Sequence, residues 1–295
     1  MPIDRNAQAP DEAGLTELKL AAVAALIGVA VAVIFVGWPD LDLAAARLFY
    51  VEPHHFLFND STLATVLRFG FRLVTWTMAA LAVIGIVLVL VKRRRLLGFG
   101  LPQWIFLALV LITGPGLIAN TLLKDNWARP RPSQVVEYGG PDRFTPVLER
   151  SGSCARNCSF VSGEASATFA IGFAIAMLAR RRRAELMAAA VAAGSIAGFI
   201  RMGEGGHFLS DVIFAAVFMA LDVALLHWLV FHVLLQRTPD EAWWHDKTVA
   251  LTEDLCRGSR EAIASGTDWL RRSFPETFGS RLVPRDDRDS GDAPP

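Results

Sequence analysis

The stretch Gly198–Asp211, which reads GFIRMGEGGHFLSD, interrupts a long apolar run with a cluster of ionisable side chains. Apolar sequence continues on both sides, so the break is expected at or near a membrane surface. Arg201, His207 and Asp211 lie in it. Ionisable groups in such a place are costly to bury and indicate a functional site, although a short polar hairpin between two membrane helices is an equally simple interpretation.

The composition is that of a membrane protein. Of the 295 residues, 53% are hydrophobic, and 29 Lys and Arg balance 29 Asp and Glu. An apolar share this high exceeds that of an ordinary soluble domain. A net charge of zero gives no reason to expect a nucleic-acid partner. The sequence therefore predicts an all-α, polytopic protein surrounded by membrane lipids, and it indicates no oligomeric state.

Six apolar runs approach the roughly 20 residues that cross a bilayer. They are expected at about 18–36, 73–91, 104–123, 163–179, 186–200 and 208–235. Basic runs at 92–95 and 180–183 follow the second and fourth spans, and short loops rich in Lys and Arg stay cytoplasmic. Both termini are then cytoplasmic, and the polar segments 124–162 and 201–207 face the periplasm of a bacterial inner membrane.

The expected organisation is one membrane domain, residues 18–236, with flanking segments. Residues 1–17 are mostly polar and are expected to be disordered and cytoplasmic. Because the composition changes from Arg237, residues 237–278 are expected to form an amphipathic cytoplasmic tail. The charged segment 279–295 is expected to be disordered.

Two further polar stretches fall on the same side of the membrane as the first. In Lys124–Pro132, KDNWARPRP, the prolines favour an extended chain in which Lys124 and Arg131 can converge on a phosphate. A basic segment that touches anionic lipid headgroups explains this stretch equally well. Ser162 and Gly163 open the fourth span, where free backbone N–H groups attract anions, although an ordinary N-cap is the simpler interpretation.

The opening stretch adds a candidate nucleophile to these anion sites. Arg201 can hold a phosphate, and His207 can attack it or move protons. Asp211 follows His207 by one helical turn, which places both on one face of the sixth span. A carboxylate at that spacing can fix the imidazole tautomer and raise its basicity.

Over about residues 40–230 the chain resembles the type 2 phosphatidic acid phosphatases. Lys124 to Arg131-Pro132 matches the motif K-x6-RP, and Arg201 through His207 to Asp211 matches the core R-x5-H-x3-D. The middle motif, usually PSGH, ends here in Glu164 in place of His. Ile200 stands where the third motif usually has Ser.

By this resemblance the fold is a six-helix bundle with its active site at the outer membrane face. His207 is the nucleophile that forms a phosphohistidine, Asp211 orients it, and no metal or cofactor is needed. The residues that bind the phosphoryl group are Lys124, Arg131, Ser162, Gly163 and Arg201. Glu164 takes the position of the general acid, and whether it donates a proton or only positions its neighbours stays open.

The function expected from the resemblance is that of a membrane hydrolase, a lipid phosphatase. The segments SFVSGEAS and GGHFLSD are most similar to the bacterial branch of the family, which acts on lipid A or related envelope lipid phosphates. Undecaprenyl diphosphate and phosphatidylglycerophosphate are other candidate substrates, and a phosphotransferase could use the same residues. A vanadate-dependent peroxidase is related by resemblance, but such enzymes are soluble.

A non-enzymatic transporter is the alternative from a different class. Asp222, His227 and His232 in the sixth span could form a proton relay. Asp222 is expected to pair with a polar neighbour inside the bundle, and two histidines five positions apart suit one helix face poorly.

Cys154 and Cys158 lie in a loop placed outside the cytoplasm, where oxidising conditions favour disulfides. A bridge between them is expected to stabilise the fold by about 2 kcal/mol and to shape the approach to Ser162. Two unpaired cysteines are the alternative.

Overall fold

The computed structural model describes residues 14–52, 54–92, 95–179 and 181–235, together with 257, 258, 261 and 265. The expected tail at 237–278 and the expected disordered segment at 279–295 otherwise lie outside the described residues. Most of the expected N-terminal segment lies outside them too. The first helix begins at Leu15, so Leu15–Glu17 belong to it and not to the flanking segment.

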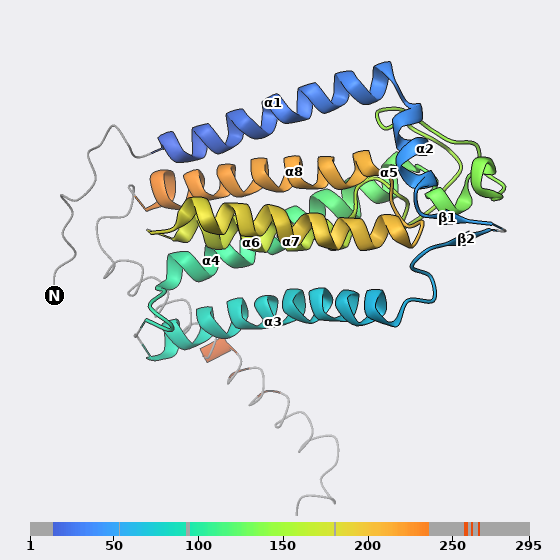
Figure 1. Ribbon diagram of the computed structural model, residues 1–295. Helices are drawn as coiled ribbons and strands as arrows, with labels where there is room; N and C mark the ends of the chain where they lie inside the picture. The colour runs from blue at the N-terminus through green and yellow to red at the C-terminus, as the bar shows by residue number, and fades with distance from the viewer. Residues whose placement is uncertain are drawn as a thin grey trace, which may run out of the picture. The chain divides into compact units, whose positions relative to one another are not determined.

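The described chain is mostly helical, with one small sheet (Figure 1). The helices are α1 (Leu15–Gly37), α2 (Asp40–Arg47), α3 (Thr62–Lys92), α4 (Leu101–Leu111), α5 (Asp125–Trp127), α6 (Gly163–Leu178), α7 (Arg183–Gly203) and α8 (Leu209–Trp228). Two segments are π-helical: η1 (Ile112–Lys124) joins α4 to α5, and η4 (Leu229–Leu234) extends α8. Strands β1 (Tyr50–Val51) and β2 (His55–Phe56) pair antiparallel, and the 3-10 turns are η2 (Pro132–Gln134) and η3 (Val136–Tyr138).

Five helices among the described residues are long and apolar enough to cross a membrane. They are Leu15–Gly37, Thr62–Lys92, Leu101–Gln134, Arg183–Gly203 and Leu209–Leu234. The expected fourth span is α6, whose 16 residues extend only about 24 Å. The second span was expected to begin near residue 73, but α3 begins at Thr62. The start was predicted too late because Arg68 and Arg72 lower the hydropathy of the first turns of the helix. The described chain is therefore mostly helical, as an all-α membrane protein requires, with five helices able to cross a membrane and one shorter apolar helix, while the six-helix bundle stays a prediction.

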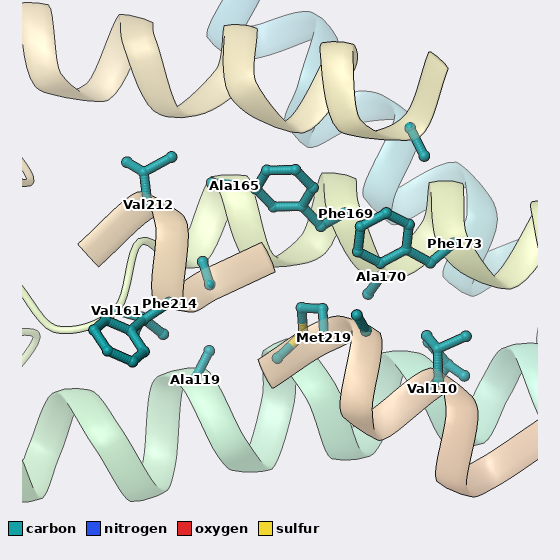
Figure 2. Packing of buried hydrophobic residues seen from close by; sticks show 14 of the residues in the cluster. Val110, Ala119, Val161, Ala165, Phe169, Ala170, Phe173, Val212, Phe214 and Met219 are labelled. Atoms are coloured by element: carbon teal, nitrogen blue, oxygen red, sulfur yellow. The ribbon is translucent and has the colours of Figure 1, made fainter. Parts of the chain in front are cut away.

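α6 is the central helix of the bundle. Ten of its 16 residues are buried. Ala165, Phe169, Ala170 and Phe173 project from it among side chains of α7 and α8 (Figure 2). Close approach depends on small residues, because a Cβ on Gly172 would lie 2.4 Å from the Cβ of Ala190 on α7. Since lipid tails are as apolar as these side chains, such van der Waals packing holds membrane helices together.

α1 and α3 lie at the periphery of this bundle (Figure 1). α1 packs along α8, and α3 packs against α4. Their outward faces carry large apolar side chains such as Leu26, 71% exposed, and Trp76, 72% exposed, as lipid-facing helices require. The small sheet, α2 and the long segment 128–162 gather at one end of the bundle, where α6 begins (Figure 1).

Candidate active site

The three polar stretches converge at this end of the bundle. Backbone hydrogen bonds join them in pairs: Ser159 N–H donates to Arg129, Ser133 N–H to Gly205, and Ser162 N–H to Asp211. Five of the predicted catalytic and phosphate-binding residues are buried, with exposed fractions of 0 to 8%: Lys124, Ser162, Arg201, His207 and Asp211. Segments far apart in sequence therefore form one enclosed polar site.

His207 is held with one ring nitrogen free. Its Nδ1 lies 2.6 Å from the carbonyl oxygen of Ser159. Because a carbonyl oxygen only accepts hydrogen bonds, Nδ1 carries the proton and Nε2 keeps its lone pair. Burial lowers the pKa of His207 to about 4, and the charges of Lys124 and Arg201 act in the same direction. The imidazole is therefore neutral at pH 7, as a nucleophile must be.

Asp211 orients this histidine less directly than expected. Its Oδ2 lies 3.8 Å from Nδ1 of His207, beyond hydrogen-bond distance. That oxygen instead accepts hydrogen bonds from Ser159 Oγ and from the backbone N–H of Phe208, the latter at 2.8 Å. Asp211 thus fixes the serine whose carbonyl holds the imidazole, and it caps the N-terminus of α8, the helix in which it lies. Its charge remains close enough to stabilise an imidazolium.

The main partner of Asp211 is Arg129, which sequence reasoning missed. Arg129 is fully buried and lies 2.5 Å from Asp211 and 2.8 Å from Asp42 on α2. It also donates to Ser210 Oγ and to the carbonyl of Thr145. One guanidinium therefore ties the first and third motifs to α2. Burial raises the pKa of Asp42 despite the charge of Arg129.

Lys124 and Arg131 both contact Asn157, and Lys124 lies beside Gly163 at the start of α6. Lys124 Nζ donates to Asn157 Oδ1, and Arg131 to the Asn157 carbonyl at 2.7 Å. Gly163 makes room for the lysine, because a Cβ there would lie 3.0 Å from Nζ. Among the described residues, the buried hydroxyl of Ser162 has no hydrogen-bond partner. A buried polar group of this kind calls for a ligand, and a phosphate oxygen fits it.

Glu164 belongs to an ion-pair network that reaches α3. Arg68 donates to both of its carboxylate oxygens, at 3.1 and 3.0 Å, and lies 3.0 Å from Glu204. Arg201 pairs with Glu204, and its Nε lies 3.8 Å from Glu164. A bidentate arginine stabilises the ionised carboxylate. The geometry therefore favours a positioning role for Glu164 over proton donation, and a phosphate at Arg201 has to compete with Glu204.

Cys154 and Cys158 are joined by a disulfide. The five-residue segment that it closes carries Asn157, which binds both Lys124 and Arg131. The hydrogen bonds of this loop reach the two cations, Asp125 and the carbonyl of Ala128, and that the bridge shapes the approach to Ser162 stays a prediction. Asn157 was missed because nothing in its local sequence distinguishes it.

A groove of about 360 Å³ leads away from the site between α3, η1 and α6. Lys124, Gly163 and Glu164 line its polar end. Its remaining wall is largely apolar, with Phe71, Trp76, Leu111 and Pro115 among its side chains. Arg72, one turn after Arg68 on α3, is a further cation in this lining. A ligand with a phosphate at one end and hydrocarbon at the other would match the groove.

Known proteins are similar to the part of the chain that holds this site. Residues 103–235 match the PAP2 superfamily. A lipid A 4'-phosphatase of Francisella tularensis subsp. novicida is 41% identical over 134 residues, 45% of this chain and 58% of that protein. One of Rhizobium leguminosarum is 28% identical over 193 residues, 61% of this chain and 83% of that protein. One of Rhizobium etli is 35% identical over 121 residues, 41% of this chain and 44% of that protein.

No solved structure matches the chain significantly. The match to the Francisella relative spans little more than half of that protein's length. All of the predicted site residues fall within the matched range, 103–235. Arg68 and Asp42, which support the site through ion pairs, lie before this range. Residues 103–235 are therefore similar to the PAP2 superfamily, and this part of the chain holds the predicted site residues.

Proposed function

We propose that the protein is an integral-membrane phosphatase that removes phosphate from lipid A, or from a closely related envelope lipid, through a phosphohistidine. The observation that carries this proposal is the neutral His207, with its Nδ1 proton held by Ser159, beside three cations and an unpartnered serine hydroxyl. The names of the three relatives support lipid A as the substrate and its 4'-phosphate as the group removed.

In the first step Nε2 of His207 attacks phosphorus, and the bond from phosphorus to the lipid oxygen breaks. Lys124, Arg131 and Arg201 meet the negative charge on the phosphoryl oxygens, together with the Ser162 hydroxyl and the backbone N–H groups at the start of α6. The imidazole becomes an imidazolium whose Nδ1–H donates to Ser159, with Asp211 nearby. Since Arg68 keeps Glu164 ionised, the leaving oxygen takes its proton from water.

In the second step water attacks the phosphohistidine, phosphate leaves and Nε2 regains its lone pair. An acceptor hydroxyl in place of water would make the same site a phosphotransferase. The names of the relatives favour hydrolysis.

The proposed topology has six spans, with α6 as the fourth, both termini in the cytoplasm and the site facing the periplasm. The basic residues that follow α3 and α6 support it, because these helices begin at the site and end at the opposite end of the bundle. The groove supports a lipid substrate that enters from the membrane, since its wall includes the outward-facing Trp76.

The test is phosphate release from purified protein in lipid nanodiscs. Lipid A, undecaprenyl diphosphate, phosphatidylglycerophosphate and phosphatidate are compared, and mass spectrometry identifies which lipid A phosphate is lost. We expect lipid A to be the best substrate and His207→Ala to release no phosphate while its Tm stays measurable. Equal rates on all four lipids, or an active His207→Ala protein, would contradict the proposal.

A further inference from the structure

The end of the bundle opposite His207 holds a second cluster of ionisable side chains. His227 is the penultimate residue of α8, and His232 lies in η4. In a regular α-helix, residues five apart point about 140° away from each other. Here the helix is π-wound, with Leu235 N–H donating to the carbonyl of Val230 five residues earlier. The two imidazoles therefore share a face, with ring centroids 6.3 Å apart, which corrects the expectation from their spacing.

Glu17 of α1 completes the cluster. Its Oε1 lies 2.6 Å from Nδ1 of His227 and 3.6 Å from Nδ1 of His232. One ligand atom from each of these residues lies within 4.8 Å of the other two. Within the described part of the chain, Nδ1 of His232 is buried without a hydrogen-bond partner. Since buried polar atoms are normally paired, this nitrogen points to a ligand that the protein itself does not supply.

We propose that Glu17, His227 and His232 bind a divalent transition-metal ion, with Zn²⁺ as the best fit. Two histidines and one glutamate are a known zinc ligand set, and π-helical turns are frequent at functional sites. Ligand atoms about 2.1 Å from a tetrahedral ion lie about 3.4 Å apart. The 3.6 Å between Glu17 Oε1 and His232 Nδ1 is already close to this value. The 2.6 Å between Glu17 Oε1 and His227 Nδ1 would have to lengthen by less than about 1 Å.

The surroundings select the kind of ion. Arg183 donates to Thr16 Oγ1 and to the Met177 carbonyl. With a single carboxylate, the site lacks the oxygen ligands that Ca²⁺ and Mg²⁺ prefer. Imidazole nitrogens suit zinc and its neighbours. The rings of Phe106 and Phe231 pack on His227, with centroids 5.4 and 4.5 Å away, and hold its orientation.

The effect of such an ion would be structural. It would join the start of α1 to the end of α8, and among the residues of α1 only Glu17, Ala24, Gly28 and Phe35 are buried. About 30 Å of helix separates His227 from His207, so the ion would take no part in phosphoryl transfer. An ion that binds the folded protein but not the unfolded chain raises the stability of the folded protein.

The experiment uses the full-length protein, stripped with a chelator and titrated with Zn²⁺ and with Co²⁺, whose visible absorption reports its ligands. We expect about one ion per chain and a rise in Tm. In His232→Ala and Glu17→Gln we expect Zn²⁺ affinity to fall by more than about 100-fold, because a change in a residue that only supports a ligand already costs roughly 10- to 100-fold. The rise in Tm should then be lost as well. His55→Ala, which removes a histidine of β2, is the matched control and keeps both.

Wild-type protein that binds no ion and shows no change in Tm would overturn the proposal. A His232→Ala protein that binds Zn²⁺ as tightly as the wild type would also overturn it. If a variant does not fold, the wild-type titration decides alone. Neither readout depends on which reaction the distant site performs.

Discussion

Replacing Arg129 by Met should destabilise the protein more than any other single change at the candidate active site. The guanidinium is 0% exposed and pairs with Asp42 and Asp211, which are 1% and 0% exposed. Removing one partner of a buried ion pair costs about 3–5 kcal/mol, because it leaves an uncompensated charge. The lower figures apply if Asp42 takes up a proton, which burial already favours by raising its pKa. At about 2–4 °C per kcal/mol, Tm should fall by about 6–20 °C.

The assay is thermal unfolding of the detergent-solubilised protein, with phosphate release measured below Tm. Arg131→Met is the matched control, since this arginine lies two positions away, is half-buried and donates to the Asn157 carbonyl. It should lower activity with little change in Tm. Adding Asp42→Asn to Arg129→Met should restore part of the lost stability, because one unpaired charge is removed. An Arg129→Met protein whose Tm lies within about 2 °C of the wild type would refute the reasoning.

Three further predictions concern the reaction. Glu164→Gln should lower the rate only a few-fold, because Arg68 keeps this carboxylate ionised; a loss of about 10²-fold or more would identify it as the general acid. The rate should fall as pH drops through the His207 pKa of about 4, since protonation of Nε2 removes the nucleophile; a fall already complete near pH 6 would contradict the buried, neutral imidazole. Arg72→Ala should raise KM for lipid A but not for a small soluble phosphate ester, and equal changes for both would remove Arg72 from lipid binding.

The fold class could be predicted because hydropathy is a local property of the sequence. Each of the five long helices falls on an apolar run that is visible without a structure. The boundaries were harder to predict where packing decides them. Arg68 and Arg72 conceal the first turns of α3, and the length of α6 depends on where the loop before Ser162 enters the bundle.

The motif residues could be predicted in the same way, because their spacing is local. The structure brings Lys124, Ser162, Arg201 and His207 together, but their supports come from distant segments. Arg129 reaches Asp42 across 87 positions, and Arg68 reaches Glu164 across 96. No periodicity connects such pairs. The carbonyl of Ser159, which holds the imidazole, could not be recognised from any side-chain pattern.

The most direct test of the central claim is to trap the covalent intermediate. Protein in nanodiscs is mixed with lipid A at low temperature and quenched within one turnover under alkaline conditions, where phosphohistidine survives. Mass spectrometry then locates the added phosphate, with His207→Ala as the control. The account predicts phosphate on His207 of the wild type and none on the variant. Phosphate on a different residue, or phosphate release without any phosphorylated protein, would contradict it.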